Sequence, residues 1–373
     1  MGSEMCIRDR TREIESIFTS LVKNSGFSAS IDGILGMGVK LPIQQPLFDL
    51  FTLINQSDAI SVRAAVDLPS GMTEDSDANA LRADFTYATG VVKVPLVEPG
   101  KLKWTGRVRY VDLGFFDEDS DDFKSHKDRV LKNYFLQKLR VLRSASTDKR
   151  SYGHLFLLAG SRDYAGAAMM SAQAALKAGV GLLTVGIPES LHSSFAAQRP
   201  EAMWVPLPET PQGGLALEGL GKIKELVGSI DAFATGPGIG RERESHALIR
   251  ETLKELSVPA ILDADALHES ILSNCENKKS LILTPHAGEF KRIANNKSPM
   301  EYASETKHIL VLKGPHTQIY NHDIRYSCMG GSSVLARGGS GDLLTGIIGA
   351  LLAKNPDNPC LLYTSDAADD TPC

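Results

Sequence analysis

Six short segments between residues 154 and 314 are apolar nearly throughout, and turns or helical stretches separate them. Strands of this kind are typical of a mostly parallel sheet that helices cover on both faces. The strand candidates are HLFLLAG (154–160), GLLTVGIP (181–188), DAFATG (231–236), PAILDAD (259–265), SLILTP (280–285) and HILVLKG (308–314). Helices are predicted at 165–179, 219–228, 244–256 and 341–354, and TQIYN with DIRYSC is predicted to form a hairpin.

The preceding part of the chain predicts a second, smaller α/β domain. Its strand candidates are 31–35, 59–69, 83–92 and 107–114, with a helix at 46–56 after the first. The acidic segment 115–129 interrupts the pattern, and we interpret it as a link between domains, although it could also begin a solvated helix. A chain of 373 residues has room for two domains.

Charge and cysteine content exclude several classes of protein. The net charge is -5, and 40 Lys+Arg are mixed among 45 Asp+Glu, so we expect no nucleic-acid partner and no membrane contact. The N-terminus lacks the apolar stretch of a signal peptide, which predicts a cytoplasmic protein. The five cysteines have neither disulfide nor zinc spacing, so free thiols are expected.

The two ends of the chain look foreign to what lies between them. MCIRDR near the start and CLLYTSDAADDTPC at the finish are similar to translated adapter sequence. We therefore expect residues 1–10 and 360–373 to be non-native, and the natural protein to be longer at both ends.

The segment ARGGSGDLLTGIIGALLAK (336–354) carries the strongest chemical signal. Its glycines free the backbone to approach an anion where an apolar helix begins, and they predict an anion hole at Gly339, Ser340 and Gly341. Asp342 would repel that anion, but it suits a base that accepts a proton from a hydroxyl attacking a phosphate. The alternative is that Asp342 is an ordinary helix cap.

Polar residues also follow several of the predicted strands, and the ends of parallel strands are where ligands bind in open α/β sheets. They are Lys313–Thr317, Gly236–Gly240, Asp263 with Asp265, and His286 with Glu289. Gly236–Gly240 could be only a tight turn, since it lacks the dinucleotide-binding register. Asp263 and Asp265 could be metal ligands, caps of a following helix, or one residue inward and one outward on a strand. In the first half, the glycine-rich GILGMGVKLP (33–42) and a strand that ends at Asp67–Ser70 are weaker signals.

Taken in order, GHLFLLAGSRDYAGAAMMSAQAALKAGVGLLTV, TGPGIG, ILDADAL, LTPHAGEF, VLKGPHT and ARGGSGDLLTGIIGALL resemble the motifs of the NAD(P)H-hydrate dehydratase family. That resemblance implies a ribokinase-like fold over residues 150–359. DGILGMGVKLP and AVDLPSG are similar to the C-terminal part of the NAD(P)H-hydrate epimerase domain, which we place at 11–125, with a linker at 126–149. The epimerase part implies a partial Rossmann-like domain.

The resemblance implies specific site residues. The nucleotide site would contain Lys313, Gly314, Pro315, His316, Thr317 and Gly341. The hydrated dinucleotide of the dehydratase would contact Ala167, Gly238, His286 and Asp342, and the epimerase pocket would contain Gly36, Met37, Gly38, Val39, Lys40, Leu41, Pro42 and Asp67. Asp32 and Ser70 match potassium ligands.

The resemblance also implies an activity, a nucleotide-dependent hydro-lyase that repairs hydrated NADH and NADPH. The expected co-substrate is ADP or ATP, with Mg2+ bridging its phosphates, K+ in the epimerase part and a homo-oligomeric assembly. Met37 stands where the family usually has Thr, and the epimerase's opening strand and helix have no counterpart before Ser28, so we expect that part to be inactive. The interval from Phe290 to His308 is short for the family, and its last helices are missing beyond Lys354.

Two other functions remain open on sequence alone. A ribokinase-like kinase of a vitamin precursor or sugar would use the same GGSGD loop. A binding module, in which the first half only docks a partner, is the third possibility.

Overall fold

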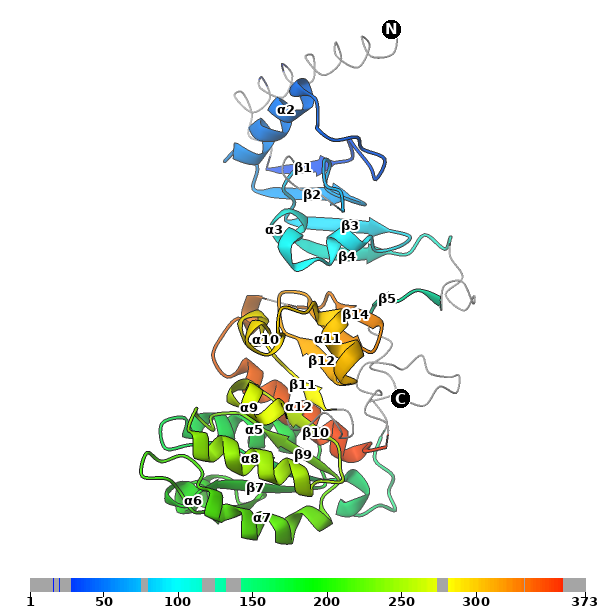
Figure 1. The fold of residues 1–373 in the computed structure, drawn as a ribbon. Coiled ribbons are helices and arrows are strands. Elements are labelled where there is room, and N and C mark those ends of the chain that lie inside the picture. The colour runs from blue at the N-terminus through cyan, green and yellow to red at the C-terminus, as the bar shows by residue number, and fades with distance from the viewer. Residues whose placement is uncertain are drawn as a thin grey trace. The chain divides into compact units, whose positions relative to one another are not determined.

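The structure is a computed structural model, and it describes residues 16, 20, 28–74, 80–115, 125–131, 142–273, 281–331 and 333–357. The chain divides into two compact units, Met1–Val130 and Leu131–Cys373. The first unit contains the strands labelled β1 to β5, and the second contains the larger sheet (Figure 1).

The first unit has a parallel sheet in the order β1-β2-β3-β4. Helix α2 is apolar along one side, and Phe51 packs there with Ile43 and Leu81. The strands are β1 (Ala29–Asp32), β2 (Val62–Val66), β3 (Phe85–Thr89), β4 (Arg107–Val111) and β5 (Asp128–Val130), and the helices are α2 (Gln45–Gln56) and α3 (Leu102–Thr105).

The strands of the second unit follow one another across its sheet in the order β14-β13-β12-β11-β10-β9-β6-β7-β8. All neighbours from β8 to β12 are parallel, whereas β12-β13 and β13-β14 are antiparallel. These strands are β6 (His154–Leu158), β7 (Leu182–Pro188), β8 (Met203–Leu207), β9 (Ala232–Thr235), β10 (Ala260–Leu262), β11 (Ile282–Leu283), β12 (Ile309–Leu312), β13 (Thr317–Asn321) and β14 (Ile324–Cys328).

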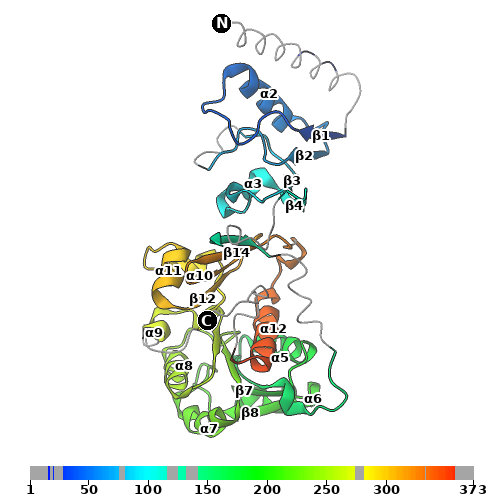
Figure 2. The ribbon, with the colours of Figure 1, turned by 90° about the vertical axis from the view of Figure 1, so that its right-hand side faces the viewer.

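Helices cover both faces of this sheet, and each face has its own apolar core. Figure 2 shows α5, α6 and α12 on one face and α8, α9, α10 and α11 on the other. The helices are α5 (Ala165–Lys177), α6 (His192–Gln198), α7 (Leu220–Leu226), α8 (Arg243–Glu255), α9 (Glu269–Leu272), α10 (Ala287–Ile293), α11 (Pro299–Thr306) and α12 (Ser340–Lys354).

Helix α12 packs unusually closely against α5. A Cβ atom at Gly346 would lie 2.1 Å from the Ser171 carbonyl oxygen, so only glycine allows this approach. Ser171 Oγ also donates a hydrogen bond of 2.8 Å to the Asp342 carbonyl oxygen. The packing therefore fixes where the first turn of α12 sits above the sheet.

The predicted architecture is confirmed, including the parallel sheet, the helix cover and the hairpin of β13 and β14. The strand predicted at 31–35 is wrong in position, because β1 ends at Asp32. There the Asp32 carboxylate accepts a hydrogen bond from the Ile34 N–H and turns the chain. Strand β8 and helices α6, α9, α10 and α11 have no counterpart among the predicted elements.

Several other predictions concern residues outside those described. They include both ends of the chain, all cysteines except Cys328, and most of the acidic segment 115–129. Cys328 is a free thiol. Within the described residues, every helix is too short or too polar to span a lipid bilayer.

Candidate active site

The carboxyl ends of neighbouring strands bring the predicted polar residues together in the second unit. Strands β10, β11 and β12 are adjacent and parallel, and they end just before Asp263, Thr284 and Lys313. His286 forms a parallel bridge with Lys313. The side chains at 263, 284, 286 and 313 therefore share one edge of the sheet.

Asp263 is the buried centre of this edge, with 1% of its surface exposed. Its Oδ1 accepts hydrogen bonds from Lys313 Nζ at 2.7 Å and Thr284 Oγ1 at 2.8 Å. Its Oδ2 accepts one from Thr345 Oγ1 of α12 at 2.8 Å. Both oxygens are thus engaged by protein donors, which compensates for burying the charge.

This network shows that the two aspartates lie in different surroundings. Asp263 points inward, whereas Asp265 pairs with Arg241 Nε at 3.0 Å. Asp263 does occupy the cap position of the short 3-10 helix Ala264–Ala266, but its carboxylate makes no capping bond there. The partners Thr284 and Thr345 were not predicted, because a single buried threonine gives no signal in the sequence.

Asp342 lies in the first turn of α12 and is partly buried. The cap of this helix is Gly339, with φ 85, and no side chain caps it, so Asp342 is not the helix cap. Among the described residues, none donates a hydrogen bond to its carboxylate. Burial raises the pKa of Asp342, and the neighbouring Asp263 raises it further, while Lys313 lowers it. A raised pKa makes this carboxylate a better proton acceptor.

The predicted anion hole lies directly beside Asp263 and Lys313. A Cβ atom at Gly341 would be 3.3 Å from Lys313 Nζ and 3.6 Å from Asp263 Oδ2. Helix N-termini leave N–H groups without intrahelical partners, which favours an anion there. The Ser340 N–H makes a long contact of 3.4 Å with the Arg337 carbonyl oxygen. Ser340 Oγ is buried and has no hydrogen-bond partner among the described residues.

The glycine loop after β9 brings two predicted substrate residues side by side. At Gly238, with φ 66, a Cβ atom would lie 2.4 Å from the Tyr164 carbonyl oxygen and 2.9 Å from Ala167 Cβ. At Gly236 it would lie 1.8 Å from the Asp263 carbonyl oxygen. The loop therefore needs glycine for close backbone contact with both α5 and the Asp263 turn.

His286 has a structural role that the sequence did not reveal, because it caps α10. Its Nδ1 accepts hydrogen bonds from the N–H groups of Gly288 at 2.9 Å and Glu289 at 3.2 Å. The buried Glu289 accepts one from the His286 N–H at 2.8 Å, and its Oε2 lies 3.9 Å from Lys313 Nζ. The imidazole is 59% exposed, and its Nε2 lies 3.4 Å from Glu289 Oε1.

The predicted nucleotide segment 313–317 divides into two parts. Lys313 turns toward Asp263, so its charge belongs to the buried network. His316 is 7% exposed, burial lowers its pKa, and its Nδ1 has no partner among the described residues. Thr317 Oγ1 makes a long contact of 3.4 Å with the Gly314 carbonyl oxygen.

In the first unit, the two predicted potassium ligands contact each other. Ser70 Oγ donates to Asp32 Oδ1 at 2.6 Å, and the Ser70 N–H donates to Asp32 Oδ2 at 2.7 Å. The Leu35 carbonyl oxygen lies 3.3 Å from Ser70 Oγ. These oxygens form a compact group, while Met37 in the neighbouring loop is 63% exposed.

Asp67 adopts φ 70 and is held by side chains from the next strand and the turn after it. Lys93 pairs with its carboxylate, and Thr89 Oγ1 donates to it at 2.6 Å. Burial acts to raise the pKa of Asp67, but hydrogen bonds from Lys93 and Thr89 outweigh it and leave the pKa lowered.

Comparison with known proteins identifies the family. The family model described as NAD(P)H-hydrate dehydratase matches residues 155–367, which is more than half of the chain. The chain belongs to the NAD(P)H-hydrate dehydratase family. A second model, described as the YjeF-related protein N-terminus, matches residues 7–94.

Curated relatives carry both regions. A bifunctional NAD(P)H-hydrate repair enzyme from Gloeobacter violaceus is 35% identical, over 89% of this chain and 68% of the relative. One from Moorella thermoacetica is 33% identical, over 87% of this chain and 64% of the relative. The chain thus spans about two thirds of the length of these relatives.

Solved structures agree on the fold. A ribokinase-like superfamily protein from Enterococcus faecalis has 26% identity and a TM-score of 0.55, covering 63% of this chain and 84% of its own. A protein from Streptococcus mutans has a TM-score of 0.53 at 21% identity, covering 65% and 94%. The second unit of this chain therefore has a ribokinase-like fold, and a Rossmann-like α/β unit precedes it.

Proposed function

We propose that the second unit dehydrates hydrated NADH and NADPH, with ATP or ADP as phosphoryl donor. The main support for this proposal is the Asp342 carboxylate in the glycine-rich first turn of α12. Its pKa is raised, and no described residue donates a hydrogen bond to it. This pairs a proton acceptor with a group of N–H donors, which is what attack of a hydroxyl on a phosphate requires.

The chemistry explains why a nucleotide is needed for a dehydration. Hydroxide is a poor leaving group, because the pKa of water is about 15.7. Phosphate leaves far more easily, since its second pKa is about 6. Asp342 accepts the proton as the ring hydroxyl oxygen attacks the terminal phosphorus of the nucleotide, and the bridging P–O bond breaks so that ADP leaves from ATP, or AMP from ADP. The ring nitrogen then donates its electron pair, the C–O bond breaks and inorganic phosphate leaves. Loss of a proton from the adjacent ring carbon forms the C=C bond of the restored NADH or NADPH.

In this proposal, the Asp263–Lys313 pair tunes the pKa of Asp342, which burial already raises. Asp263 raises the pKa of Asp342 by repulsion, while Lys313 keeps that effect in check. Gly341, on the predicted nucleotide side, lies close to Lys313 and Asp263. Gly238, on the predicted dinucleotide side, lies close to Ala167. The nucleotide and the dinucleotide would therefore meet at Asp342. His286 would contact the dinucleotide through the exposed part of its imidazole.

We propose that Mg2+ arrives with the nucleotide. Within the described residues, no group of three or more His, Cys, Asp or Glu could hold a metal ion, and both Asp263 oxygens already have donors. This fits Mg2+, which often keeps its waters and binds substrate phosphates together with one or two carboxylates. When bound, the ion neutralises charge on the transferring phosphate.

We propose that the first unit is the C-terminal part of an epimerase domain. The match to residues 7–94 supports this assignment. We propose domains at 11–125 and 150–359, joined by a linker at 126–149. The oxygens of Asp32, Ser70 and Leu35 form a group that suits K+, which binds oxygen ligands. Conversion of the unreactive hydrate stereoisomer, measured with and without K+, tests whether this part is active.

One experiment tests the dehydratase activity directly. Hydrated NADH is mixed with the protein, Mg2+ and either ATP or ADP, and absorbance at the reduced-nicotinamide band is followed. We expect that absorbance to recover, with one inorganic phosphate released for each NADH restored. If it does not recover and phosphate appears on another alcohol, the protein is a small-molecule kinase instead.

A further inference from the structure

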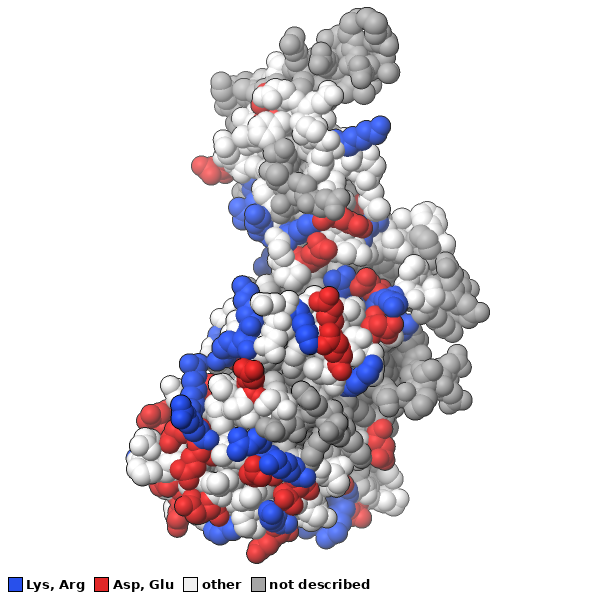
Figure 3. Space-filling view, viewed as in Figure 1, with Lys and Arg blue, Asp and Glu red and all other residues white. Residues whose placement is uncertain are grey.

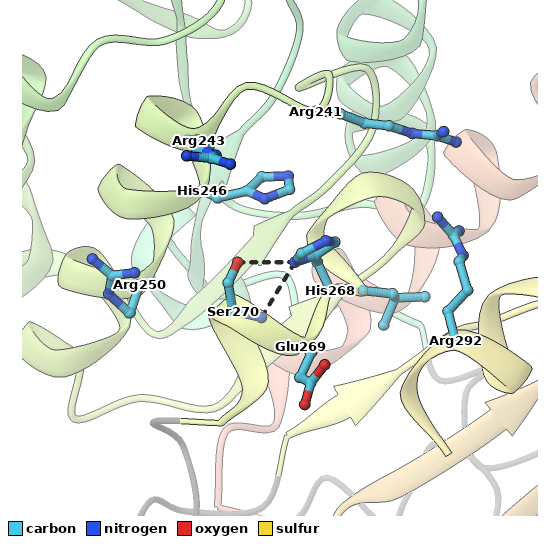
Figure 4. A pocket seen from close by; sticks show the side chains of 9 residues that line it. Arg241, Arg243, His246, Arg250, His268, Glu269, Ser270 and Arg292 are labelled. Atoms are coloured by element: carbon cyan, nitrogen blue, oxygen red, sulfur yellow. Dashed lines mark hydrogen bonds between the residues drawn. The ribbon is translucent and has the colours of Figure 1, made fainter. Parts of the chain in front are cut away.

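A pocket of about 730 Å³ in the second unit is lined by four arginines. Figure 4 shows arginines entering it from several elements, with two histidine rings between them. The lining residues are Arg241, Arg243, His246, Arg250, Leu267, His268, Glu269, Ser270 and Arg292. On the face seen in Figure 3, Lys and Arg side chains lie among acidic ones over the described surface, so the concentration of arginine in this pocket is local.

Helix α8 supplies one wall of the pocket. Arg243, His246 and Arg250 recur at i, i+3 and i+7, which places them along one side of the helix. Nearby carboxylates offset part of the charge, since Asp265 pairs with Arg241 and Glu251 with Arg250. Among the described residues, Glu269 is the one carboxylate that lines the pocket with four arginines, so these lining residues carry a net positive charge.

His246 shows that a polar ligand atom would be favourable here. The residue is 5% exposed, and its Nε2 has no hydrogen-bond partner among the described residues. Its ring packs against His268, with the ring centroids 4.7 Å apart. A buried ring nitrogen without a partner is costly, and a ligand hydroxyl that donates a hydrogen bond to it would remove that cost.

Two of the lining arginines belong to segments that also carry candidate active-site residues. Arg241 follows Gly238 and Gly240 in the loop that contacts Ala167. Its guanidinium interacts electrostatically with Tyr164 and with Glu289, the residue whose carboxylate lies 3.9 Å from Lys313 Nζ. Arg292 belongs to α10, the helix that His286 caps. A dinucleotide reaching from Asp342 past Gly238 would therefore meet these arginines.

We propose that this pocket binds a phosphate monoester, and that the 2′-phosphate of hydrated NADPH is one source of it. Arginine is the side chain best suited to hold phosphate by paired hydrogen bonds. NADPH differs from NADH only by this phosphate, so the pocket would set the preference between the two hydrates. This inference rests on the proposed dehydratase function. A separate phosphate-bearing molecule is the other source.

A double variant tests the pocket in the full chain. Arg243→Gln with Arg250→Gln removes two positive charges from the α8 wall, and Arg150→Gln, exposed in the 3-10 helix Lys149–Tyr152, is the matched control. The measurement is the ratio of kcat/KM for hydrated NADPH to that for hydrated NADH. The ratio cancels any loss of folded protein. We expect the double variant to lower it about tenfold or more, and the control to leave it unchanged.

Binding of inorganic phosphate, measured by calorimetry on the same proteins, distinguishes the substrate's own 2′-phosphate from a separate phosphate-bearing molecule. A fall in the ratio assigns the pocket to the substrate's own phosphate. An unchanged ratio with phosphate binding lost in the double variant assigns it to a separate phosphate-bearing molecule. If neither quantity changes, the pocket is not a phosphate site. Failure of the wild-type protein to act on either hydrate counts against the proposed function, and phosphate binding alone then decides the pocket.

Discussion

Asp67 of the first unit and Asp342 of the second were both predicted to face a substrate, yet their surroundings are opposite. Asp67 is held by Lys93 and Thr89, and these donors leave its pKa lowered. Asp342 has no donor among the described residues, and burial together with Asp263 raises its pKa. A carboxylate whose lone pairs are already satisfied can orient a ligand, whereas an unsatisfied one can take a proton.

In the second unit, the nearby cation pairs with the neighbouring aspartate and not with Asp342 itself. Lys313 binds Asp263 at 2.7 Å, so its charge is used on the buried aspartate. In the first unit, Lys93 binds the predicted substrate-facing aspartate itself. Burial of Asp342, its neighbour Asp263 and the pairing of the lysine elsewhere thus separate a carboxylate held by a cation from one that can act as a base.

The largest expected effect is on turnover. Asp342→Asn keeps the shape of the side chain but removes the proton acceptor, so we expect turnover of the hydrate to fall by about 10²–10⁴. Nucleotide binding, measured by calorimetry, should stay nearly intact because the glycine turn is unchanged. Unchanged turnover would mean that Asp342 is not a base, and the contrast with Asp67 would have no chemical meaning.

Removing the buried lysine should have the next largest effect. Lys313→Met leaves the Asp263 carboxylate, 1% exposed, without its cation, and we expect a loss of about 3–5 kcal/mol in the free energy of unfolding. Scanning calorimetry measures this. The control is Lys313→Met combined with Asp263→Asn, which removes both charges and should recover much of the loss. If the double variant is no more stable than the single one, the pair is not coupled.

The corresponding change in the first unit should cost much less. The Lys93 and Asp67 side chains are 13% and 28% exposed, so solvent screens their pair, and we expect Lys93→Met to cost about 0.2–1 kcal/mol. The pKa of Asp67 is lowered on folding, so this contribution is present above its unfolded value of 3.8 and disappears as pH falls through the folded value. Urea titrations at neutral and acidic pH check this. A cost equal to that of Lys313→Met would remove the distinction between the two pairs.

The sequence predicted which residues meet at the carboxyl edge of the sheet, but not how their side chains pair there. Periodicity placed the strands, and the strand-end rule then brought Asp263, His286 and Lys313 together. Which donor meets which acceptor depends on side-chain packing across β10, β11 and α12, and no local pattern encodes it. Thr284 and Thr345 therefore went unnoticed, and His286 proved to be a helix cap. The arginines of the basic pocket come from segments far apart in the chain, which one sequence does not connect.

Another small expected effect is a gain in stability when the reactive Asp342 carboxylate is lost. Because the pKa of Asp342 is raised on folding, the folded protein binds its proton more tightly, and ionisation costs stability as pH rises from 3.8 through the raised value. Asp342→Asn should remove this cost, so its advantage over the wild type should grow with pH and reach about 0.5–1 kcal/mol at neutral pH. Melting temperatures of both proteins between pH 4.5 and 7.5 measure the difference. Asp67→Asn should lower stability instead, because a neutral amide cannot form an ion pair with Lys93. A shift of the same sign in both variants would show that ion pairing does not distinguish the two aspartates.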